Sequence, residues 1–187
     1  GELQKVVKWL RKGGPVDAFG PALTGDGRVS AFTLLHVAAT NDHLAMVREL
    51  LKRGASIDLQ TSLGVTALMG AAGLGHLSIV LVLLQHSADP DLQDINGITA
   101  LMDAAIHGHL SILLVLLQHS ANPDLQDSDG ITALMMAADG GHEACVQALL
   151  RAKANTELLD KDGGTALQWA EAQGHTAIAA LIRQHAA

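Results

Sequence analysis

The chain has 187 residues, a net charge of −7 and an isoelectric point near 5.7. Nonspecific affinity for nucleic acid comes largely from clustered lysine and arginine, so this charge argues against DNA or RNA as a partner. The longest apolar runs, 79–84 and 112–117, are far shorter than the roughly 20 residues of a membrane helix, so we expect no membrane insertion.

The first predicted element is a helix over residues 3–13. Its stretch 6–13 aligns with 47–54, which suggests the second half of a repeated unit whose first half is missing. The following stretch, 17–33, is twice as long as its later equivalent, 58–66, and its insertion contains Phe19, Pro21, Gly25 and Gly27. We interpret the insertion as a tolerated surface loop; a finger that contacts a partner is the alternative.

From residue 28 onward one unit is repeated with a period of 33 residues. Threonines mark the period at Thr33, Thr66, Thr99, Thr132 and Thr165, and histidines follow each of them at His43, His76, His109, His142 and His175. Such a period indicates a solenoid, in which each unit packs on its neighbours.

The unit 61–93 shows the predicted cycle. Thr66 caps a short alanine-rich helix through Leu68 and Ala72, glycines at 73 and 75 end it, and a second helix covers 77–85. The segment 87–91 contains Pro90 and starts a hairpin loop into the next unit. Helices this short are not stable alone, so the units must stack.

The motifs at 33–39, 75–80 and 87–91 closely resemble the ankyrin repeat. The resemblance implies an all-α ankyrin-repeat solenoid of helix-turn-helix units joined by β-hairpin loops. It covers one domain, 1–187, with an N-terminal half-repeat and extended hairpin at 1–27 and repeats at 28–60, 61–93, 94–126, 127–159 and 160–187. Only His36 keeps the family's histidine after the threonine, and polar residues near 183–185 cap the last helix.

The histidines and acids do not form a convincing chemical site. The Gly-His pairs recur at the start of four of the five second helices, which is typical of a scaffold, and residues 127–130 lack the remaining ligands of a calcium loop. We expect no enzyme activity, no cofactor and no metal; a weak metal binder or an enzyme accessory is the alternative. Turn aspartates at 89–94, 124–129 and 160–162 are interpreted as a solvated edge, with a basic partner as the alternative.

Repeats 61–93 and 94–126 agree at about 24 of 33 positions, so their differences are informative. Most differences fall at the hairpin tips and along the first helices, where the ankyrin resemblance places a concave groove. An aliphatic groove with a polar border suits a protein or peptide segment. The predicted groove residues are Phe32, Leu63, Val65, Leu74, Ile95, Ile98, Asp103, Ile106, His107, Asp129, Ile131 and Asp139.

Leu81 and Leu114 break the polar pattern on the outward side of the second helices, where Arg48 and Gln147 occupy the matching positions. A helix that is apolar almost all round is normally covered on every face.

The main functional prediction rests on the repeat resemblance and the groove. It is a non-catalytic, intracellular protein-binding scaffold, cytoplasmic or, as the alternative, nuclear. The other predictions are a self-associating homodimer through these leucines and an engineered ankyrin scaffold.

Overall fold

A computed structural model describes residues 2–23 and 29–185 of the chain. It divides into two compact units, Gly1–Asp89 and Pro90–Ala187, which are described separately. The inserted residues Gly25 and Gly27 lie outside the described residues.

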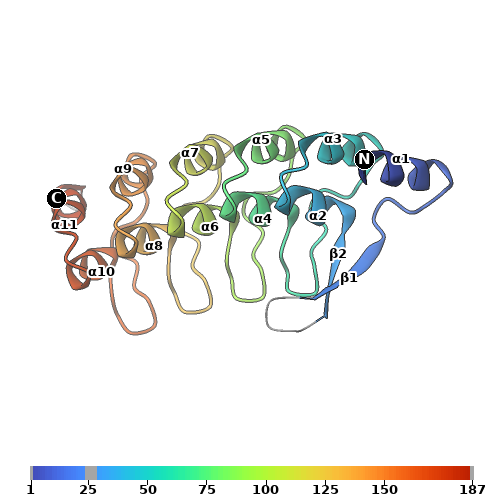
Figure 1. Ribbon diagram of the computed structural model, residues 1–187. Helices are drawn as coiled ribbons and strands as arrows, with labels where there is room; N and C mark the ends of the chain where they lie inside the picture. The colour runs from blue at the N-terminus through green and yellow to red at the C-terminus, as the bar shows by residue number, and fades with distance from the viewer. Residues whose placement is uncertain (1, 24–28, 186–187) are drawn as a thin grey trace. The chain divides into compact units, whose positions relative to one another are not determined.

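The first unit contains five helices and one strand pair among its described residues. Helix α1 (Glu2–Arg11) occupies the predicted half-repeat and packs on α3. The two following helix pairs are α2 (Leu34–Thr40) with α3 (Leu44–Lys52) and α4 (Ala67–Gly73) with α5 (Leu77–Gln85). Figure 1 shows the short helices α2 and α4 in one layer and the longer helices α1, α3 and α5 in another.

The second unit repeats this arrangement three times. Its pairs are α6 (Ala100–Ile106) with α7 (Leu110–Gln118), α8 (Ala133–Asp139) with α9 (Glu143–Arg151), and α10 (Ala166–Ala172) with α11 (Thr176–His185). The short helices α6, α8 and α10 contact one another in sequence, as do α7, α9 and α11. The predicted helical solenoid units are confirmed.

The threonine ladder starts the short helices. The Thr66 hydroxyl accepts a hydrogen bond from the Met69 N–H at 3.2 Å, and the same cap recurs at Thr33, Thr99, Thr132 and Thr165. Each cap satisfies an amide that the first turn leaves without a helical partner. The alanines that follow, such as Ala71 and Ala72, are fully buried and allow adjacent helices to approach closely.

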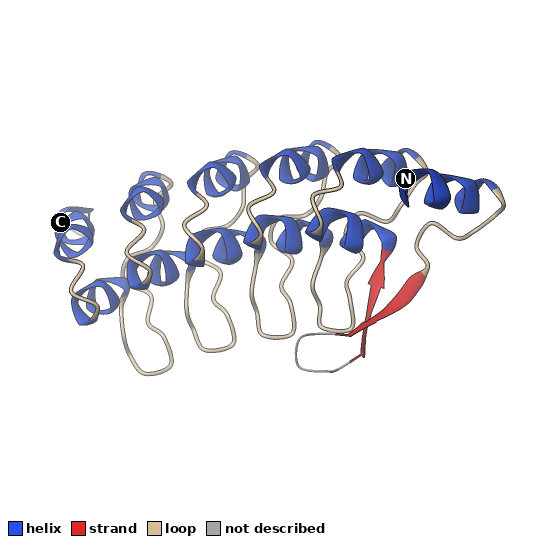
Figure 2. Ribbon diagram, in the orientation of Figure 1, coloured by secondary structure: helices blue, strands red, loops and turns tan. Residues whose placement is uncertain are grey.

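Strands occur in only one of the described loops, as Figure 2 shows. Strand β1 (Phe19–Leu23) pairs antiparallel with β2 (Val29–Thr33), with Phe19 opposite Thr33 and Leu23 opposite Val29. The described residues on the two sides of the insertion thus pair as an antiparallel strand pair. The other loops between repeats turn back without strands.

The later loops use tight turns in which an aspartate holds the backbone. In the loop of repeat 94–126 the Asp94 N–H donates to the Ile98 carbonyl at 3.0 Å, and the Asp94 carboxylate accepts from the N–H groups of Asn96 and Ile98. Asp127 and Asp160 repeat the pattern. These aspartates are turn residues, as the sequence predicted.

No helix within residues 2–23 and 29–185 combines the length and apolar character needed to cross a bilayer. The core instead lies between the two helical layers of each unit, with Leu68, Ile79 and Leu83 buried in the first unit and Leu101, Ile112 and Leu116 in the second.

Candidate protein-interaction surface

The histidine ladder positions the ends of the short helices. His142 Nε2 donates to the Ile106 carbonyl at 3.0 Å, and His175 Nε2 donates likewise to the Asp139 carbonyl. In the first unit His76 Nε2 donates to the Thr40 carbonyl at 3.1 Å. In these three cases a histidine of the following repeat holds the carboxyl end of the preceding short helix, which is where several predicted groove residues lie.

The glycines before the ladder histidines His109 and His142 have a physical reason. Gly108 has φ +67°, and a Cβ there would stand 2.5 Å from a ring nitrogen of His142. Gly141 has φ +71°, and a Cβ there would stand 2.7 Å from the His175 ring. Both the left-handed backbone and the close approach favour glycine, so the Gly-His pairs belong to the scaffold.

In the second unit the aliphatic groove residues lie at the loop tip and along α6. Ile95 is 64% exposed and Ile106 is 50% exposed, whereas Ile98 and Ile131 are half-buried beside their turns. Large side chains this exposed contribute little to the core of the unit. They form the apolar part of the candidate surface.

Asp103 and His107 lie next to these isoleucines. The half-buried Asp103 carboxyl has a pKa raised to about 6, mainly by burial, while the nearby His107 opposes the rise and Asp94 adds to it. His107 Nδ1 donates to the Asp103 carbonyl at 2.9 Å, and its ring stacks on that of His109 with centroids 5.8 Å apart. The structure therefore brings Asp103 and His107 together as a polar border.

The other two acids of the predicted border are already engaged. Asp129 is exposed and pairs with Lys161 at 3.2 Å. Asp139 is half-buried and accepts a hydrogen bond from Gln173 Nε2 at 2.7 Å. Each acid is thus tied to the following repeat.

The first unit carries the remaining predicted residues. Leu74 is 56% exposed, while Phe32, Leu63 and Val65 are half-buried. The Phe32 ring meets the His36 ring edge-on with centroids 6.1 Å apart. His36 bridges two repeats, because its Nε2 donates to the Val65 carbonyl at 3.0 Å and its Nδ1 lies 2.7 Å from the Thr33 hydroxyl. Burial lowers the pKa of His36.

The outward leucines differ in exposure. Leu114 on α7 is 41% exposed, and Leu81 on α5 is half-buried. Gln147, which holds the matching position on α9, is also half-buried but uses its amide to bond Glu143. Leu114 therefore remains an exposed apolar side chain on the layer opposite the loops.

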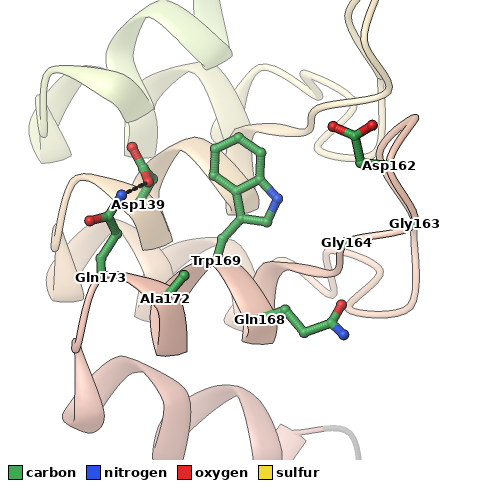
Figure 3. Close-up of a pocket in the computed structure, with 8 residues that line it drawn as sticks. All are labelled: Asp139, Asp162, Gly163, Gly164, Gln168, Trp169, Ala172 and Gln173. Atoms are coloured by element: carbon green, nitrogen blue, oxygen red, sulfur yellow. Dashed lines mark hydrogen bonds between the residues drawn. The ribbon is translucent and has the colours of Figure 1, made fainter.

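The structure adds a feature that our sequence analysis missed, a pocket of about 400 Å³ in the last repeats, open to solvent. The half-buried Trp169 ring stands between the Asp139 side and the Asp162 side of this pocket (Figure 3). Its remaining lining residues are Gly163, Gly164, Gln168, Ala172 and Gln173. The signal was present in the sequence, because Trp169 matches Val37, Gly70, Asp103 and Met136 in the other repeats.

Residues 2–23 and 29–185 contain no group of three or more His, Cys, Asp or Glu side chains that could hold a metal ion. Cys145 is buried, and burial raises the pKa of its thiol, which disfavours the reactive thiolate. The candidate surface presents apolar, carboxylate and imidazole groups.

Comparison with known families agrees with the repeat pattern. The family described as ankyrin repeats (3 copies) matches residues 2–94, 35–127 and 101–187. No curated protein sequence matches the chain significantly.

Proposed function

Because the chain belongs to the ankyrin repeat family, whose members are generally protein–protein interaction modules, we propose that it is a non-catalytic scaffold that binds a protein segment. The segment lies against the loop tips and short helices of repeats 94–126 and 127–159. Ile95, Ile98, Ile106 and Ile131 supply apolar contacts, and Asp103, His107, Asp129 and Asp139 border them.

One observation carries this proposal. Repeats 61–93 and 94–126 are nearly the same, yet the second has isoleucine at 95 and 106 where the first has Ser62 and Gly73. Both isoleucines are at least half exposed. A scaffold position that accepts serine or glycine does not need isoleucine for folding, so partner contact is the better explanation.

The first unit offers a smaller contribution of the same kind. Leu74 is well exposed beyond the end of α4, and Leu63, Val65 and Phe32 lie half-buried near the loops. We assign these four residues to contacts made by the same class of partner.

The test is affinity capture from cell extract with the whole chain and with a variant carrying Ile95→Asp and Ile106→Asp. Proteins held by the apolar surface should be captured by the parent chain and lost with the variant. For a purified partner, the variant should weaken binding at least tenfold, about 1.4 kcal/mol.

The matched control is Leu114→Asp, which places the same charge on an exposed apolar site of α7. It should leave capture unchanged. Capture that survives the double isoleucine change, or is lost equally in the control, contradicts the proposed surface.

A second function is favoured by the exposure of Leu114. In that case the chain is a self-associating structural unit whose contact surface is the outward side of the second helices. Experiments can distinguish the two functions, because the changes at Ile95 and Ile106 should leave self-association intact.

A further inference from the structure

The pocket in the last repeats contains two departures from the repeat pattern, Gly164 and Trp169. Position 164 is glycine, whereas Phe32, Val65, Ile98 and Ile131 hold the matching positions of the other repeats. A Cβ on Gly164 would stand 2.8 Å from an Asp160 carboxylate oxygen and 3.2 Å from Trp169 Nε1. The missing side chain thus leaves room for the indole.

The Trp169 ring is fixed in the pocket wall. Its Nε1–H donates to the Asp160 carboxylate at 2.7 Å, and that carboxylate is itself held by the N–H groups of Asp162 and Gly164. These contacts lower the pKa of Asp160, so the acceptor stays charged. A ring anchored at its polar edge offers its π surface to the pocket (Figure 3).

The charged groups of the lining are all negative. Asp139 and Asp162 line the pocket, and no lysine, arginine or histidine is among its eight residues. The last repeat has one lysine and one arginine, and both are engaged elsewhere. Lys161 pairs with Asp129, and Arg183 pairs with Glu171. The pocket is therefore complementary to a cation that the last repeat does not supply.

An aromatic face flanked by carboxylates selects among cations. A cation over a tryptophan face gains from the ring quadrupole, and tryptophan is the best of the aromatic residues for this contact. Guanidinium is planar, so it stacks on an indole and at the same time donates to a carboxylate through its fork of N–H groups. Ammonium cannot stack in this way and is more strongly hydrated.

We propose that this pocket binds the arginine side chain of an extended partner segment. The inference rests on the proposed function, since it identifies one residue of the same class of partner. The guanidinium stacks on Trp169, and the carboxylates of Asp139 and Asp162, on either side of the ring, supply the opposite charge. Gln173, which already donates to Asp139, keeps that carboxylate in place.

The test uses short peptides, so that it measures the pocket without the rest of the partner. The whole chain, labelled with ¹⁵N, is titrated with acetyl-Gly-Gly-Arg-Gly-Gly-amide and with the same peptide containing citrulline or lysine. The indole N–H signal of Trp169 and the amide signals of Gly163 and Gly164 report occupancy. The chain has two tryptophans, so Trp9→Phe assigns the indole signal.

The arginine peptide should shift these signals saturably, with a dissociation constant of about 1 mM. Citrulline has nearly the shape of arginine but no charge, and it should bind about tenfold more weakly or not at all. Lysine should bind more weakly than arginine. Equal binding of citrulline contradicts a cation site, and equal binding of lysine contradicts the guanidinium assignment.

Variants then locate the site. Asp139→Asn with Asp162→Asn should weaken arginine binding about tenfold. The matched control, Glu143→Gln with Glu157→Gln, removes the same charge from exposed positions of the second unit outside the pocket and should change binding less than about twofold. An equal loss of arginine binding in the control would show that net charge alone causes the effect, which would overturn the proposal.

Trp169→Leu removes the π surface and should abolish the saturable shifts of Gly163 and Gly164, while circular dichroism checks that the variant folds. Should that variant unfold, the paired Asp→Asn result still decides the proposal. If the arginine peptide does not bind, the capture experiment with the Ile95 and Ile106 variant is unaffected. The two proposals are therefore tested independently.

Discussion

Asp103 is the residue of the candidate surface whose charge depends most on its surroundings. It occupies a position on the short helices that is valine, glycine, methionine or tryptophan in the other repeats. Burial raises the pKa of its carboxyl to about 6, against an ordinary value of 3.8. A carboxylate kept in this position at a cost in folding free energy suits a group that a bound partner would contact.

The pH dependence of Asp103 follows from this shift. The folded state binds the proton more tightly than the unfolded state, so the group's contribution to stability falls as pH rises from about 4 through 6. Asp103→Asn removes the ionisation. We expect it to raise the free energy of unfolding at pH 7.5 by up to about 3 kcal/mol and to change it little at pH 4.

Urea unfolding of the parent chain and the variant at both pH values measures this difference. An effect of equal size at pH 4 and pH 7.5 would show that the ionisation of Asp103 is not the cause.

His36 is a second residue whose identity differs from its counterparts in the other repeats. The later repeats place Met69, Met102 and Met135 where His36 lies. A carbonyl can only accept, so the Nε2 that lies 3.0 Å from the Val65 carbonyl carries the proton, and Nδ1 accepts from the Thr33 N–H. The burial that lowers the pKa of His36 is consistent with this neutral ring.

At the scale of elements, a glutamine in the loops joins one repeat to the next. Gln126 Nε2 donates to the Gly130 carbonyl of its own loop at 2.6 Å and to the Leu159 carbonyl of the next loop at 2.9 Å. Gln93 makes the same two bonds, to Gly97 and to Gln126. The matching position in repeat 127–159 is Leu159, whose side chain has no amide to donate.

We predict that Gln126→Leu destabilises the second unit by about 1–3 kcal/mol, because two carbonyls lose their donor. Thermal or urea unfolding measures the loss. The control is Gln147→Leu, which removes a single exposed bond to Glu143 and should cost less than about 0.5 kcal/mol. Similar losses in the two variants would contradict a special role for the loop glutamine.

At the scale of the whole molecule, the outward leucines bear on assembly. Burying a leucine contributes roughly 1.5–3 kcal/mol, and Leu114 is 41% exposed in the single chain. Contact with a second copy would remove that surface from water.

If the chain self-associates, multi-angle light scattering at high concentration should show a dimer. Leu81→Arg with Leu114→Gln, which restores polar residues found at the matching positions Arg48 and Gln147, should then give a monomer. A parent chain that stays monomeric at high concentration removes the self-association function, and the isoleucine surface is unaffected by that result.

The fold was predictable because each step of it is local and repeated. The Thr66 hydroxyl caps the first turn of α4, and the residue before each ladder histidine has a positive φ, which glycine adopts at four of the five positions. The candidate site was less predictable. Ile95 and Ile106 are found by comparing two repeats, but their exposure depends on side chains from other elements.

The sequence by itself determined the period, the family and the positions that differ between repeats, since all three are properties of spacing along the chain. Only the tertiary structure decided which differing positions act together. Gly164 and Trp169 are five residues apart in the sequence, but the pocket also needs Asp139 from the preceding repeat. Stacking of successive repeats brings Asp139 to Trp169, and side-chain contacts between repeats are not written in the spacing of either one.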